Sequence, residues 1–253
     1  MMFSRIQVLL CVGAVLLLAG CASGPQTRKD DPFEPFNRQV YKFNDAVDEA
    51  VLKPVAVTYK KVMPKPVRSG VKNFFGNLKD GWSVVNNGLQ FKGQNAADSL
   101  SRFGINTLLG LGGVLDVASE LGIERHTKDF GHTLGYWGVP AGPYLVLPML
   151  GPSTVRETAA LPVDAVGNLS NHLADQATRD ALLVVRVVDL RANLLGTSDM
   201  LDAVALDKYS FTRDTYLQYR RNAIYDGNPP DADDSGGSDM PYDNPVNSEK
   251  TAP

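Results

Sequence analysis

Histidines are the residues of this sequence best suited to acid–base catalysis or metal binding, and there are three of them. His126 and His132 are six residues apart, which matches neither two ligands on one helical face nor a zinc-protease motif, and His172 is remote. A lipase-type Gly-x-Ser-x-Gly signature is absent, and the glycines at 110–113 are too loosely spaced for a dinucleotide fingerprint. We interpret the histidines as structural, and expect no enzyme activity, no metal and no other cofactor.

One cysteine has a clearer chemical role. Arg5 precedes an apolar run at 6–18, which is short of the roughly 20 residues that a membrane span needs, so residues 1–20 read as a signal peptide. The run ends in Leu-Ala-Gly-Cys, which resembles the bacterial lipobox, in which the cysteine is acylated. We therefore expect Cys21 to be the lipid-anchored first residue of the mature chain, the alternative being an ordinary signal peptide beside a chance cysteine. Ala22 takes the place of the aspartate that commonly retains lipoproteins in the inner membrane, which indicates the outer membrane.

Composition divides the rest of the chain. Residues 21–31 are small and polar and suit a tether, whereas 226–253 are rich in Asp, Pro, Gly, Ser and Asn and read as a disordered acidic tail. The formal net charge is −3 and most of the acid excess lies in that tail, so the body is nearly neutral and nucleic acid is not an expected partner. The body, 32–225, is long enough for one domain with a sizeable core.

The elements that must position any site are mainly α-helical. Apolar residues three and four apart between Phe36 and Val51 form one helical face, and Pro54 either ends that helix or starts the next. Further helices are expected at 98–109, 175–188 and 207–225, with little alternation typical of strands.

Two stretches do not fit an ordinary helical protein. Residues 103–115 and 130–155 carry no formal charge, and the second is interrupted repeatedly by glycine and proline, which prevents a continuous helix. Irregular apolar backbone of this kind is either buried in protein at membrane depth or a core loop of a soluble protein, and composition does not separate the two.

Arginines and aspartates gather between Arg179 and Arg191, with Arg186 among them. Such a cluster is usually a solvated helix face with ordinary ion pairs. The functional alternative is that some of these arginines meet lipid phosphates or a partner.

Motifs over nearly the whole body resemble the MlaA (VacJ) family of outer-membrane lipoproteins. The resemblance begins with Asp-Pro-Phe-Glu at 31–34 and continues with Asn-Thr-Leu-Leu-Gly-Leu-Gly-Gly at 106–113. Its most specific portion is Phe-Gly-His-Thr-Leu-Gly-Tyr-Trp-Gly-Val at 130–139, followed by Gly-Pro-Tyr-Leu-Val-Leu-Pro at 142–148 and Asp-Lys-Tyr at 207–209. Lys208 stands where the family commonly has proline.

The resemblance implies a single ring-shaped, mainly helical domain in the periplasm-facing leaflet of the outer membrane, with an amphipathic channel. Such proteins associate with trimeric porins and pass mislocalised phospholipid to a soluble periplasmic carrier, which maintains lipid asymmetry without covalent chemistry. We expect residues 130–152 to form an irregular gating hairpin and residues 106–113 to lie near the channel wall, although the same residues could simply pack the ring. The candidates are Asn106, Thr107, Gly110, Gly112, Gly113, Gly131, Gly135, Gly138, Gly142, Pro143, Tyr144 and Pro148.

Two rival functions remain open at this stage. A structural lipoprotein that stabilises porins without moving lipid would not need the charge-free irregular segments. A periplasmic lipid hydrolase would need His126 or His132 beside a carboxylate and lacks a nucleophile motif.

Overall fold

The computed structural model describes residue 28 and residues 30–230. The expected signal peptide, Cys21, most of the tether and the tail from 231 onward lie outside the described residues, so these stay predictions. The residues at the two predicted domain boundaries make structural contacts, and the boundaries themselves stay predictions. Asp31 is fully buried, and Asp226 forms an ion pair with Lys128 at 2.6 Å.

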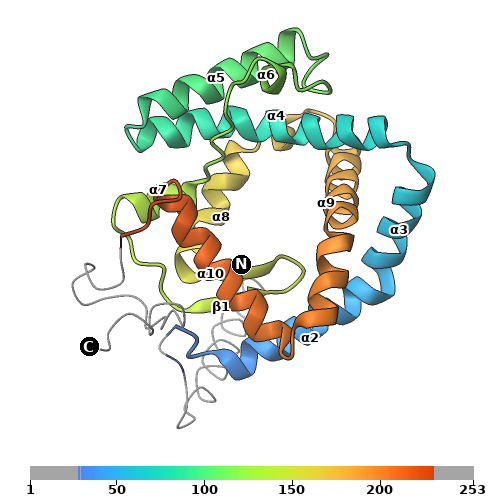
Figure 1. Ribbon diagram of the computed structural model, residues 1–253, viewed down its shortest axis with the longest axis vertical. Helices are drawn as coiled ribbons and strands as arrows, with labels where there is room; N and C mark the ends of the chain where they lie inside the picture. The colour runs from blue at the N-terminus through green and yellow to red at the C-terminus, as the bar shows by residue number, and fades with distance from the viewer. Residues whose placement is uncertain (1–27, 29, 231–253) are drawn as a thin grey trace, which may run out of the picture.

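Helices follow one another around a ring (Figure 1). In chain order they are α2 (Glu34–Val47), α3 (Lys53–Val62), α4 (Lys65–Leu89), α5 (Gly93–Leu108), α6 (Val117–Glu120), α7 (Phe130–Tyr136), α8 (Val155–Gly167), α9 (Gln176–Val204) and α10 (Lys208–Ile224), with a short 3₁₀ helix at Leu169–His172. In Figure 1, α4, α9, α2, α10 and α8 surround the centre, α3 packs along the outer side of α9, and α5 lies on the side of α4 away from the centre. The expected mainly helical, ring-shaped fold is confirmed.

Local sequence explains where these helices begin. Asp175 caps α9 by accepting the Thr178 amide at 2.7 Å, and Asp207 caps α10 through the Tyr209 amide at 3.1 Å, so each satisfies an amide that would otherwise lack a partner. Pro54 lies in the first turn of α3, where its missing N–H is not needed. Pro54 does not interrupt the helical backbone: a π-helical turn at Asp48–Leu52 joins α2 directly to α3.

The apolar segment expected to be an irregular hairpin contains two regular elements. Its first part is helix α7, and its second is a β-hairpin of β1 (Tyr144–Leu147) and β2 (Gly151–Thr154), antiparallel with Tyr144 opposite Thr154. The hairpin packs on α2, because Asn37 donates to the Tyr144 carbonyl at 3.0 Å and accepts the Val146 amide at 2.9 Å.

Burial is distributed unlike that of a soluble domain. The interior positions of α4 are polar: Asn77, Asp80, Ser83, Asn86 and Asn87 are all buried there. Large apolar side chains instead point outward, including Phe43 on α2, which is 51% exposed. Among residues 30–230, no helix combines the length and apolar character needed to cross a bilayer. The fold therefore buries many polar groups and exposes many large apolar ones, although small apolar clusters such as Tyr144, Val146, Tyr209 and Leu217 are also buried.

Candidate functional site

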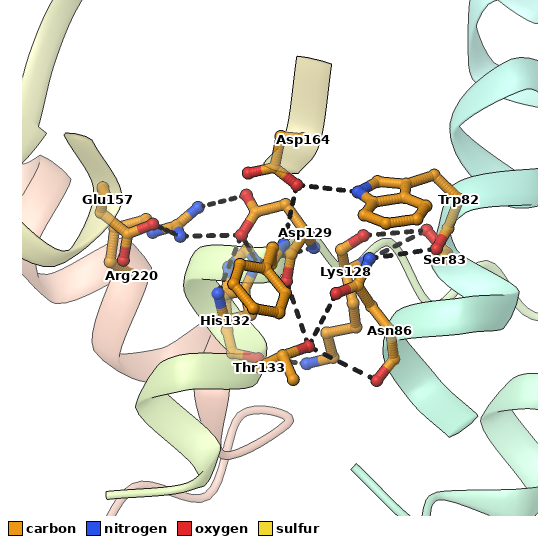
Figure 2. A network of polar contacts seen from close by, with 12 residues as sticks. Trp82, Ser83, Asn86, Lys128, Asp129, His132, Thr133, Glu157, Asp164 and Arg220 are labelled. Atoms are coloured by element: carbon orange, nitrogen blue, oxygen red, sulfur yellow. Dashed lines mark hydrogen bonds and ion pairs between the residues drawn. The ribbon is translucent and has the colours of Figure 1, made fainter. Parts of the chain in front are cut away.

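The polar interior is organised around Asp129, the N-cap of α7 (Figure 2). Its carboxylate accepts the His132 amide at 2.8 Å and both terminal nitrogens of Arg220 on α10, at 2.7 and 3.0 Å. Arg220 also binds the buried carboxylate of Glu157 on α8. Burial alone would raise the pKa of Asp129, but the hydrogen bonds from His132 and Arg220 outweigh it and hold that pKa well below its ordinary value. The network joins α7, α8 and α10.

A second carboxylate connects the same region to α4. Asp164 on α8 accepts the Trp82 indole N–H at 2.7 Å (Figure 2). It also accepts the Phe130 amide at 2.8 Å. Burial raises the pKa of Asp164, and these two hydrogen bonds oppose the rise. Helix α7 is thus held by α4, α8 and α10 together.

The outer helix pair has its own buried ion cluster. Arg102 on α5 and Asp80 on α4 are each 1% exposed, with Nε and Oδ2 3.4 Å apart. Arg102 also donates to Asp116 at 2.7 Å, and Asp116 accepts the Asn106 side-chain amide at 3.0 Å. Because a charge buried without a partner is very unfavourable, this cluster fixes α5 and the turn after it against α4.

The predicted channel-wall residues lie beside this cluster. Asn106 is buried, and its side-chain oxygen accepts the Ala118 amide at 2.8 Å, while Thr107 accepts a hydrogen bond from Asn77 on α4 at 2.9 Å. Gly113 has a φ of +95°, and a Cβ there would lie 2.6 Å from Asn77, so no larger residue fits. Gly110 also lies in close contact, with the Asn106 and Leu115 carbonyls, whereas Gly112 faces open space. These contacts show a packed turn against α4, and a role in a channel wall stays a prediction.

The predicted gating residues divide into fixed and turn positions. Gly131 and Gly135 lie in α7, where a Cβ would collide with Glu157 or with Ile224. Gly138 and Gly142 have φ values of +85° and +67° in the connection to β1, and the Pro143 carbonyl accepts the Val155 amide at 3.1 Å. Tyr144 is fully buried against Tyr209 and Tyr216, whereas Gly138, Gly142 and Pro148, the last at the hairpin turn, are exposed. Movement is therefore easiest to place at the hairpin turn, and the gating role itself stays a prediction.

The histidines are held in structural settings. His132 is buried and its Nδ1 accepts the Asp129 amide at 3.2 Å, which completes a capping box at the start of α7. His126 Nε2 lies 3.3 Å from Asp98, and His172 contacts the Val166 carbonyl. Within the described part of the chain, no group of three His, Cys, Asp or Glu side chains is placed to hold a metal.

The apolar exterior includes three strained positions. Phe91, Leu111 and Met149 have φ values of 56°, 54° and 61°, which side chains other than glycine rarely adopt, and they are 90%, 74% and 72% exposed. Each lies in a turn, and each presents an apolar side chain to the surroundings. An apolar side chain exposed to water would not offset the strain of its backbone, whereas the same side chain in contact with hydrocarbon would.

Sequence reasoning missed most of the interior network, and it left the arginines of α9 as an unresolved group. Arg191 pairs with Asp48 at 2.6 Å and Asp189 accepts from Tyr59 at 3.1 Å, as expected of ordinary ion pairs and hydrogen bonds. Arg186 differs, because no ion pair to it is found among the described residues. The signal that could have drawn attention to Arg186 is its position between the apolar residues Val185 and Val187.

Known proteins match this chain over almost all of the described region. The family model described as MlaA lipoprotein matches residues 29–223.

The chain belongs to the MlaA lipoprotein family.

Relatives and a solved structure agree with the MlaA assignment. The intermembrane phospholipid transport system lipoprotein MlaA of Shigella flexneri is 36% identical over 224 residues, covering 86% of this chain and 88% of the relative. That of Escherichia coli K12 is 35% identical with the same coverage. A structure solved in work on the structural basis for maintenance of bacterial outer membrane lipid asymmetry matches with a TM-score of 0.69 and 34% identity, covering 77% of this chain and 98% of that chain. The MlaA fold expected from the motifs at 31–34, 106–113 and 130–148 is therefore confirmed.

Proposed function

We propose that this chain is a lipid-anchored outer-membrane protein that withdraws mislocalised phospholipid from the outer leaflet and maintains lipid asymmetry. The observation that carries the proposal is the inside-out distribution of side chains. Asn77, Asn86 and Asn87 are buried, while Phe91 and Leu108 are 90% and 83% exposed. A protein immersed in one leaflet satisfies both preferences, because acyl chains cover its perimeter and polar groups remain inside.

The same arrangement supplies a mechanism of transport without covalent chemistry. A phospholipid crossing a leaflet must carry its charged headgroup past hydrocarbon, where an unpaired charge is very costly. In this proposal, polar groups on the wall of the ring would replace water around the headgroup, while the acyl chains stay in contact with apolar surfaces. Transport then follows lipid distribution, and the protein lowers the barrier.

Membrane attachment combines two contributions. The acyl chains on Cys21 would each add about 0.8 kcal/mol per buried CH₂. The apolar perimeter would hold the ring itself in the periplasm-facing leaflet of the outer membrane, rather than leaving it at the end of a tether.

Two kinds of protein partner follow from this role. Lipid leaving the ring must cross an aqueous compartment, so a soluble periplasmic carrier receives it, and trimeric porins hold the ring at a fixed depth. Both partnerships are part of the proposal, and the exposed apolar perimeter, which a porin wall would cover in part, supports the porin.

Gating is proposed for the turn of the β-hairpin. Helix α7 is fixed by Asp129 and Asp164, but Met149 and Leu150 at the turn are 72% and 70% exposed. Asn44 holds the turn from α2, because it donates to the Leu147 carbonyl at 2.9 Å and accepts the Met149 amide at 2.8 Å. Release of these two bonds would free the turn without disturbing α7.

Outer-leaflet phospholipid is the measurement that tests the function. A strain lacking the protein should show increased acylation of lipid A by a surface phospholipid-dependent acyltransferase, reversed by the wild-type chain and by His126→Ala. His126→Ala separates a conduit from a hydrolase, because a hydrolase relying on that residue would not be restored. An unchanged level on deletion, with normal porin abundance, contradicts transport. If deletion instead lowers porin abundance, the structural lipoprotein is supported.

A further inference from the structure

An apolar groove lies where the first half of α4 meets the first half of α9. It has a volume of about 480 Å³ and is lined by Val71, Phe74, Phe75, Leu182 and Val185, with Val114 at one side. That volume lies within the range of about 300–1,000 Å³ typical of ligand pockets. Almost every lining atom is apolar, so the groove by itself suits hydrocarbon.

Two cations follow the groove on its two helices. Val71, Phe75 and Lys79 are four residues apart and form one stripe along α4. On α9, Arg186 comes one turn after Leu182. Each helix therefore passes from an apolar groove residue to a cation within one turn.

Both cations are in contact with solvent, although protein surrounds them in part. Lys79 is exposed and Arg186 half-buried, and no carboxylate forms an ion pair with either one in the part of the chain that the structure describes. Burial lowers the pKa of Lys79, the charge of Arg186 lowers it further, and Asp129 opposes both. Burial also lowers the pKa of Arg186.

We propose that the α4–α9 junction is a binding site for one anionic phospholipid, with an acyl chain in the groove and the phosphate between Lys79 and Arg186. The site rests on the proposed function and deepens it by naming a lipid class. Two cations for which the described residues supply no ion-paired carboxylate attract a phosphate, and they repel the ammonium of a zwitterionic ethanolamine headgroup. The occupant is therefore a lipid of the phosphatidylglycerol type rather than phosphatidylethanolamine.

Calorimetric titration of the purified full-length chain in detergent tests the site. The probes are dioctanoyl phosphatidylglycerol, dioctanoyl phosphatidylethanolamine and glycerol 3-phosphate, the last having the phosphate without acyl chains. The wild type should bind phosphatidylglycerol about tenfold more tightly than phosphatidylethanolamine and should not bind glycerol 3-phosphate measurably. The double variant K79Q/R186Q should lose the preference, whereas K72Q/R179Q, which removes one cation from each of the same helices, should keep it.

A second pair of variants tests the groove. Leu182→Trp fills it and should weaken both lipids, whereas Val184→Trp, at a position that is 61% exposed and outside the lining, should weaken neither. Equal affinity of the wild type for both lipids overturns the proposal, as does a retained preference in K79Q/R186Q. Tight binding of glycerol 3-phosphate would assign the cations to free phosphate instead.

Failure of this site is distinguishable from failure of the transport function. A chain that restores lipid asymmetry in cells but shows no phosphatidylglycerol preference in detergent overturns the site alone. A chain that shows the preference and does not restore asymmetry overturns the transport function alone.

Discussion

Arg220 on α10 binds both carboxylate oxygens of Asp129, at 2.7 and 3.0 Å, although the two residues are 91 positions apart in the sequence. The same guanidinium contacts Glu157 on α8. One guanidinium thus bridges two carboxylates where three helices converge, while Arg156 also pairs with Glu157 at 2.8 Å, and we expect closure of the ring on this side to depend on this bridge.

Arg220→Gln should destabilise the fold by about 3 kcal/mol, because it leaves Glu157 and Asp129 without their shared cation. Circular dichroism melting in detergent measures the loss. Arg221→Gln is the matched control, since Arg221 donates only an exposed hydrogen bond to the Pro230 carbonyl, and it should change stability by less than about 0.5 kcal/mol. Equal melting of the two variants would contradict the role of Arg220 in ring closure.

Asp129 should also make the stability of the fold depend on pH. Its folded-state pKa lies below the unfolded value of about 3.9, so its contribution is complete above that value and is lost as the pH falls towards the folded pKa. Melting temperatures measured from pH 6 to pH 3 should therefore fall more steeply for the wild type than for Asp129→Asn, which keeps the N-cap but cannot ionise. Parallel curves would show that Asp129 is not the group responsible.

The positions of α2, α5, α9 and α10 could be read from the sequence because capping and periodicity are local, whereas α4 and α8 were not predicted. Asp175 and Asp207 precede α9 and α10, and a 3.6-residue period of apolar residues indicates the helix that follows each of them. The end of α9 was harder to place, since it continues to Val204 rather than stopping near residue 188. No proline or glycine near residue 188 marks the end of a helix there.

The direction in which helices face could not be read in the same way. Periodicity identifies an apolar stripe on α2, but it does not say whether that stripe faces protein or lipid. Phe43 on the stripe is half exposed, whereas Asn37 is fully buried and binds the β-hairpin. A hairpin was expected within 130–152 but as an irregular one; its two strands were not predicted, because the turn holds Met149 at positive φ where a glycine or asparagine would normally signal a turn.

Leu111→Asn should reduce membrane association while raising stability in detergent. Asparagine tolerates the left-handed conformation of this position better than leucine, which relieves strain of up to about 1 kcal/mol, but it removes an exposed apolar group from the perimeter. The measurements are liposome flotation, in a Cys21→Ala background so that acyl chains do not mask the effect, and thermal melting. Leu115→Asn is the control for strain, because it removes an exposed leucine without the positive φ and should lower flotation without raising stability. If Leu111→Asn floats as well as its parent, this turn does not contact lipid.

Gly113→Ala should destabilise the fold more than Gly112→Ala. Both positions have positive φ, which disfavours alanine by about 1–2 kcal/mol, but only at Gly113 does the added methyl meet the Asn77 side chain. Urea unfolding in detergent compares the two, and a smaller loss for Gly113→Ala would contradict the packing.

Because Gly112 faces open space, Gly112→Trp then tests the channel-wall prediction with less disturbance of packing. A rise in outer-leaflet phospholipid at normal protein abundance would support that prediction. Unchanged asymmetry at normal abundance would assign the 106–113 segment to packing of α5 on α4 and remove it from the route of the lipid.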